Sequence, residues 1–201
     1  AATRADLGKL ALQDLTKLTG SPCSTPQGTD ASVALGLRID ETHPPHVLVV
    51  REALTAPLVL PGDLVVLPAK LLEASDGPEA IAGYIIAASQ NALQADATQP
   101  LLEHAGLIAT LRLLASGAIS TDALDGYGES LLASTPPMQP ADVLLPVFKA
   151  TQISATPYAY AVDKSGETTL PLIEADPFPK GSSPPVLDDA MWLNLQSICT
   201  G

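Results

Sequence analysis

Apolar residues recur every three or four positions through much of this 201-residue chain, which is the spacing of amphipathic helices. The first such stretch covers residues 3–18, and the following "TGSPCSTPQG" contains the glycine and proline residues that end a helix. In the helix expected near residue 141, Pro146 should cause a kink or an early end. The same spacing predicts further helices at residues 29–38, 69–75, 79–97, 99–116, 120–134, 141–153 and 188–199.

Two short β-branched runs, Val47–Arg51 and Leu64–Leu67, predict strands. Between them an extended "APLVL" leads into the turn Pro61-Gly62-Asp63. Residues 158–173 alternate in polarity around "DKSG", which predicts a β-hairpin, and a Pro-rich coil follows. The expected fold class is therefore α+β: a helical domain with a small β-sheet, a C-terminal β-hairpin and a short last helix.

We expect one domain over residues 1–201, because no internal repeat or clear linker divides the chain. Its parts are N-terminal helices (1–40), a sheet with core helices (45–152), and a C-terminal hairpin and tail (155–201). Hydrophobic residues make up 46% of the chain and charged residues 16%, a balance typical of a packed globular domain.

The formal net charge is -12, and neither Lys nor Arg is concentrated in any segment. Proteins that bind nucleic acids gather these residues on one face, so we expect no nucleic-acid partner. The apolar runs are shorter than the roughly 18 residues that a membrane-spanning helix needs.

The two cysteines, Cys23 and Cys199, stand near opposite ends of the sequence. Neither has another Cys or a His at metal-ligand spacing, so no metal site is expected there. They form either two buried free thiols or one disulfide, and a disulfide would indicate an oxidising compartment. The start "AATRADLGKL" has neither a Met nor an apolar signal core. This start leads us to expect a processed or trimmed chain, with a membrane tether upstream of Ala1.

The segment from about residue 45 to 115 combines a strand, an "LPGD" turn, a second strand, a short "P-x-K-L-L" helix and a long helix that starts near Glu79. This order resembles the zinc metallopeptidases that include the CAAX prenyl protease and bacterial heat-shock membrane proteases. In that family, the long helix carries the motif H-E-x-x-H. The resemblance implies a metallopeptidase-like fold, a bacterial origin and an extracytoplasmic, periplasmic location.

Aligned with the family motif, Ala87 and Asn91 stand at the two His positions and Ala88 at the general-base Glu. The family's third ligand, the Glu of an E-x-x-x-D pattern, also has no counterpart, since Ala133 stands four residues after Glu129. Zinc needs imidazole or carboxylate ligands, and the zinc-bound water needs a base. We therefore expect no catalytic residues of this type, no metal and no cofactor.

Three functions stay open at this point. The first is a non-catalytic pseudo-peptidase that binds a protein or peptide. The second is a hydrolase with a rebuilt site, made from Ser89, Gln90 and Asn91 together with His104 or Glu129. The third is an assembly module that uses the strongly apolar helix at 101–115.

The remaining candidate side chains have ordinary interpretations. His43 and His46 flank two prolines in a loop, where we expect solvated side chains. Tyr158, Tyr160 and Phe178 either form the floor of a small groove or pack across the predicted hairpin.

Overall fold

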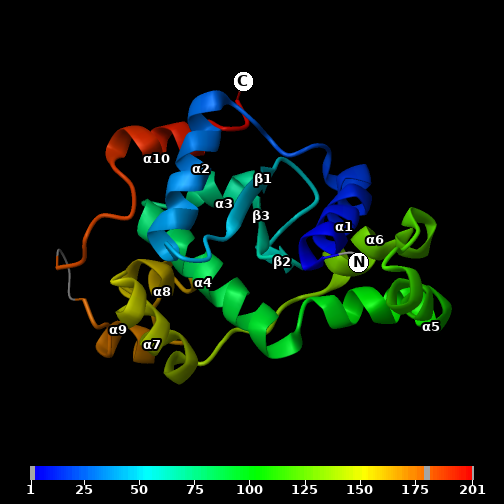
Figure 1. Cartoon of the computed structure of the whole chain (residues 1–201). Coiled ribbons are helices and arrows are strands. Elements are labelled where there is room, and N and C mark those ends of the chain that lie inside the picture. Colours follow the sequence, from blue (N-terminus) through cyan, green and yellow to red (C-terminus); the bar gives the residue numbers. More distant parts are fainter. Residues whose placement is uncertain (1–2, 179–181, 201) are drawn as a thin grey trace.

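The computed structural model describes residues 3–178 and 182–200, and its centre is a small three-stranded sheet (Figure 1). The strand order is β1-β3-β2, with β1 parallel to β3 and β2 antiparallel to it. The strands are β1 (His46–Val50), β2 (Leu58–Leu60) and β3 (Leu64–Pro68). The segment expected to be merely extended is thus the edge strand β2.

The loop between β2 and β3 packs under the first helix, α1 (Arg4–Thr19). Gly62 and Asp63 both adopt positive φ, at 80° and 59°, and so turn the chain within three residues. A Cβ on Gly62 would lie 2.6 Å from the Cα of Ala5, and one on Gly8 would collide with the carbonyl oxygen of Pro61. Glycine at positions 8 and 62 therefore allows α1 to cover the hairpin tip.

The strand side chains alternate between two hydrophobic cores, as the two-residue period of a strand requires. Val65 and Leu67 point into one core, and Val66 points into the other. The larger core includes α2 (Pro26–Ile39), α4 (Pro78–Ala95), α7 (Ala141–Thr151), α8 (Thr156–Val162) and α10 (Asp189–Gln196). The smaller core includes α1, α5 (Thr98–Ser116), η1 (Thr121–Leu124) and α6 (Tyr127–Ala133). Figure 1 shows these two groups of helices on either side of the sheet.

The long helix α4 follows the short α3 (Ala69–Ala74), in the predicted order. Pro78 lies in its first turn, where a missing N–H costs no hydrogen bond, and Glu79 faces the positive end of the helix dipole. Ile81 and Ile85 are fully buried, as their spacing predicts. Gly83 lets the ring of Tyr158 on α8 approach the helix closely.

One glycine lies within α5 and one proline lies within α7. Gly106 has a φ of 81° and kinks α5, which the sequence pattern had suggested as one continuous helix. Helix α7 continues past Pro146 to Thr151, so of the two expected effects of this proline, a kink or an early end, the early end does not occur. Pro146 is exposed, and its ring lies on the outer side of the helix.

The predicted C-terminal β-hairpin is wrong. Residues 158–173 instead belong to α8 and to α9 (Leu170–Glu174), joined by a loop in which Asp163 accepts hydrogen bonds from Ser165 and Thr168. The alternating "YAYAV" forms one short helix with Tyr158 buried and Tyr160 exposed. The two rings therefore do not pack across a hairpin.

A disulfide between Cys23, in the segment between α1 and α2, and Cys199, after α10, has a Cα–Cα distance of 4.9 Å. Arg51 donates a further hydrogen bond to the carbonyl oxygen of Cys199. Of the two states considered for these cysteines, the bonded one is the one present. Residues 179–181 of the expected coil, and Ala1 with its expected tether, lie outside the described residues.

Arg38 fastens the end of α7 to the segment that leads to α10. Its guanidinium donates to the carbonyl oxygens of Thr151 at 2.7 Å, Gln152 at 2.9 Å and Pro185 at 3.2 Å. Among the described residues, no helix is both long enough and apolar enough to cross a bilayer.

Candidate functional site

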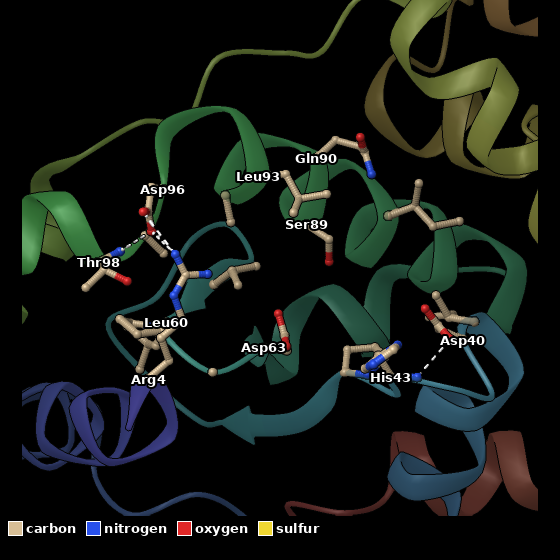
Figure 2. Close-up of a pocket in the computed structure, with 18 of the residues that line it drawn as sticks. Arg4, Asp40, His43, Leu60, Asp63, Ser89, Gln90, Leu93, Asp96 and Thr98 are labelled. Carbon is tan, nitrogen blue, oxygen red and sulfur yellow. Dashed lines mark hydrogen bonds and ion pairs between the residues drawn. The ribbon is translucent and has the colours of Figure 1, made fainter. Parts of the chain in front are cut away.

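A cleft of about 410 Å³ lies between α4, the β2–β3 hairpin and the loop that joins α2 to β1 (Figure 2). One face of α4 supplies its upper wall, because residues 86, 89, 90 and 93 follow helical spacing. The edge strand β2 and the hairpin loop supply the opposite wall. The site therefore lies where the long helix crosses the open edge of the sheet.

The walls of the cleft are mainly apolar and its margin is polar. Figure 2 shows the Ser89 hydroxyl and the Asp63 carboxylate pointing into the same space between α4 and the hairpin. The apolar walls come from four elements and comprise Ile39, Val59, Leu60, Ile86, Leu93 and Val147. Such a lining buries apolar groups of a ligand and orients the ligand by its few polar contacts.

Two charged groups at opposite ends of the cleft are held in place by their neighbours. Asp96 pairs with Arg4 at 2.9 Å and accepts a hydrogen bond from the backbone N–H of Thr98. That N–H and the side chain of Thr98, and after them the charge of Arg4, lower the pKa of Asp96. At the other end, the backbone N–H groups of His43 and Thr42 lower the pKa of Asp40. Both carboxylates therefore stay ionised at neutral pH.

The positions aligned with the metal motif lie on a different face of α4 from the cleft. Ala87 and Ala88 are buried, and neither belongs to the cleft lining. Ala87 packs in the larger hydrophobic core. Their methyl groups offer no ligand atom or base, so this face of α4 serves packing.

The third motif position, Asn91, belongs to a network of side-chain amides. Its Nδ2 donates to the carbonyl oxygens of Ala87 and Pro137, each at 3.2 Å. Its Oδ1 accepts from Gln139 at 2.6 Å, and Gln94 donates to Gln139 at 3.1 Å. Asn91 is thus fully engaged by protein groups.

Gln139 was not a candidate residue in the sequence. It lies in "TPPMQP", a stretch without helical or strand period, yet only 5% of it is exposed. A buried amide needs several hydrogen-bond partners, and Asn91 and Gln94 supply them. No local signal predicts this pairing, because more than 40 residues separate Gln139 from α4.

The residues suggested for a rebuilt hydrolase site are not brought together. Ser89 and Gln90 line the cleft. His104 on α5 instead lies 3.0 Å from the carbonyl oxygen of Asp125 and contacts the ring of Tyr127. Glu129 is exposed on α6, which packs on α1. Within the described residues, no hydrogen bond joins Ser89, the one cleft hydroxyl suggested as a nucleophile, to a base.

His43 lies in the α2–β1 loop, whereas His46, which the sequence had predicted to lie in the same loop, is the first residue of β1. His43 and His46 are both exposed, and only His43 lines the cleft. Over residues 3–178 and 182–200, no group of three or more His, Cys, Asp or Glu side chains is placed to hold a metal ion.

Comparison with known proteins adds no assignment. No family model and no curated protein matches the sequence. The function must therefore be inferred from the cleft and its surroundings.

Proposed function

We propose that this chain is a non-catalytic pseudo-peptidase domain that binds a protein or peptide segment in the cleft beside α4. The observation that carries the proposal is that one face of α4 lines a cleft whereas another face of the same helix is buried. The face with Ser89 and Leu93 borders an open, mainly apolar cleft. The face with Ala87 and Ala88 is buried, and Asn91 is held by Gln139.

The metallopeptidase-like identity of the fold is part of the same proposal. It is supported by the succession β1, β2, β3, α3 and α4, which matches the element order of that family. In the proposed history, the scaffold and the groove beside the long helix were kept and the metal ligands were lost. Fold and function are separable in this way because a site occupies few positions of a fold.

The cleft chemistry favours a ligand with an apolar side chain flanked by a positive charge. Val59 and Leu93 offer apolar surface, whereas Asp63 offers an exposed carboxylate at the margin. The chain's net charge of -12 also favours cationic over anionic ligands during encounter.

We further propose that the domain acts outside the cytoplasm, on the periplasmic side. The Cys23–Cys199 disulfide supports this location, since such bonds persist in oxidising compartments. A fusion of the protein, expressed from its own gene, to a reporter that is active only in the periplasm tests this location.

Selection of peptides from a random library on the immobilised protein tests the cleft. Selected peptides should bind with micromolar affinity. Leu93→Arg should weaken binding at least tenfold, because Leu93 forms part of the apolar wall of the cleft. Leu93 is 73% exposed, so the fold should tolerate this substitution. The matched control is Leu193→Arg on α10, which is 63% exposed and outside the cleft. Equal binding by both variants would refute the cleft as the site, and cleavage of bound peptides would refute the non-catalytic assignment.

A further inference from the structure

The second half of α5 presents an apolar face to solvent. Its outward side chains are Leu107, Ile108, Leu111 and Leu114, with exposed fractions of 74%, 79%, 55% and 78%. We call this set the α5 face. Large apolar side chains gathered in this way on one soluble domain usually mark a contact surface.

The α5 face is a short, separate helical segment. Gly106 breaks the helix before it, and Gly117 ends it in the left-handed conformation at a φ of 70°. The opposite side of the segment is anchored, because Leu113 packs against the smaller core. Because Leu113 holds the opposite side against the core, the α5 face points to solvent over roughly 15 Å of helix.

The charges around the α5 face disfavour a lipid bilayer as its partner. Helices that lie in a membrane surface carry several Lys or Arg residues along their polar side. Residues 107–116 contain a single charged residue, Arg112, and the nearest charged neighbours beyond them, apart from His104, are Glu103 and Asp122. Anionic headgroups would meet carboxylates at both ends of the segment.

The same charges suit a second copy of this chain. Each copy carries a net charge of -12, so most pairs of surfaces would repel. Residues 104–121 contain no Asp or Glu, and a contact over the α5 face brings no carboxylates of this segment together. Leu107, Leu111 and Leu114 also have the four-then-three spacing of helices that pair along one seam.

We propose that two copies of the chain associate through their α5 faces as an antiparallel helix pair. A two-fold axis at Leu111 places this residue against its own copy. It also places Leu107 opposite Ala115, a large side chain against a small one, and Ile108 opposite Leu114. The antiparallel arrangement sets the helix dipoles in opposition, which a parallel pair would not.

The size of the contact sets its strength. Stable complexes bury about 800 Å² on each partner, and a contact made by a single helix of this length falls in the smaller, transient class. The dimer should therefore be weak and reversible, absent near 1 μM and populated above roughly 100 μM.

Sedimentation velocity over this concentration range tests the proposal with the complete chain. The wild-type protein should shift from monomer towards dimer, and Leu111→Glu should stay monomeric at every concentration. Leu193→Glu, at a similarly exposed leucine on α10, should dimerise as the wild type does. A wild-type protein that is monomeric throughout, or a dimer unaffected by Leu111→Glu, would overturn the proposal.

Cysteine cross-linking tests the register of the pair. The two native cysteines are joined in a disulfide, so an added cysteine is the one free thiol of the chain. Leu111→Cys should cross-link to itself on mild oxidation, and Leu107→Cys should cross-link to Ala115→Cys more readily than to itself. Preferential Leu107→Cys self-cross-linking would overturn the antiparallel arrangement.

Flotation with phosphatidylcholine vesicles tests whether the α5 face binds a lipid bilayer and not a second copy of the chain. If the monomeric protein floats with vesicles and Leu111→Glu does not, lipid is the partner and the dimer proposal is wrong. These readouts do not depend on the cleft, so the two proposals stand or fall separately.

Discussion

The side-chain nitrogen of Gln139 donates a hydrogen bond of 2.6 Å to the side-chain oxygen of Asn91, and this bond links the segment before α7 to α4. Gln139 is almost fully buried and also exchanges hydrogen bonds with Gln94. The face of α4 that carries Asn91 is therefore closed by a structural contact, whereas the adjacent face remains open as the cleft.

Removal of this contact should destabilise the fold. Gln139→Ala leaves the part-buried oxygen of Asn91 without its short hydrogen bond, and we expect the free energy of unfolding to fall by about 1–3 kcal/mol. Gln99→Ala is the control, because Gln99 makes one exposed hydrogen bond to Glu103 and should change stability by less than about 0.5 kcal/mol. Urea denaturation measures both, and equal losses would argue against a structural role for the network.

Zinc should neither bind nor stabilise the protein. Ala87, Ala88 and Asn91 supply no strong ligand, so no metal-binding free energy is coupled to folding. We expect far less than one zinc ion per chain by elemental analysis and an unchanged melting temperature in the presence of a chelator. Near-stoichiometric zinc, or a melting temperature that falls with chelator, would contradict this prediction.

The sequence predicts the elements whose period is long enough to be unambiguous. The strands around residues 47 and 65 and the helix at 78–95 occur as expected, since one face of each is continuously apolar. The short "YAYAV" segment carries too few residues to separate a period of two from a period of 3.6. Its helix is fixed by Asp176, which caps it from 20 residues away in the sequence.

Only those residues of the candidate site that are close together in the sequence could be predicted to lie together. Ser89 and Gln90 lie on one turn of a predicted helix, and both reach the cleft. The association of Gln139 with Asn91, and the position of Asp63 opposite Ser89, depend on how distant segments fold together. A pattern along a single sequence carries no information about such contacts when each partner is an ordinary polar residue.

Loss of the Cys23–Cys199 disulfide should lower the melting temperature by several degrees. In the chain-entropy model, closing a loop of 176 residues contributes at most about 5 kcal/mol. The double variant Cys23→Ala, Cys199→Ala removes the bond without depending on reductant access to the buried Cys199. Differential scanning calorimetry measures the change, and added reductant should have no further effect on the double variant. An unchanged melting temperature would show that α10 is held by packing alone.

Asp176 is the most heavily hydrogen-bonded carboxylate near the C-terminal helices. It accepts from the hydroxyls of Ser154 and Thr156, each at 2.5 Å, and from the backbone N–H groups of Ala155, Thr156 and Phe178. Burial alone would raise the pKa of Asp176, but the hydrogen bonds from Ser154 and Thr156 outweigh it, and the pKa lies below its ordinary value.

This lowered pKa predicts acid-sensitive stability. As the pH falls, the Asp176 carboxylate of the unfolded chain takes up a proton at about pH 4, before that of the folded chain does. Above that pH, the contribution of Asp176 to the free energy of unfolding is complete. It is lost as the pH falls through the lower pKa of the folded state. Asp176→Asn should therefore lower the free energy of unfolding by about 1.5–3 kcal/mol at pH 7, and the difference in this free energy between variant and wild type should become smaller below pH 4. Glu174→Gln, an exposed neutralisation on α9, should cost less than about 0.5 kcal/mol at pH 7. Urea unfolding between pH 3 and pH 7 measures these differences, and a gap that is constant with pH would show that Asp176 is not stabilised as the anion.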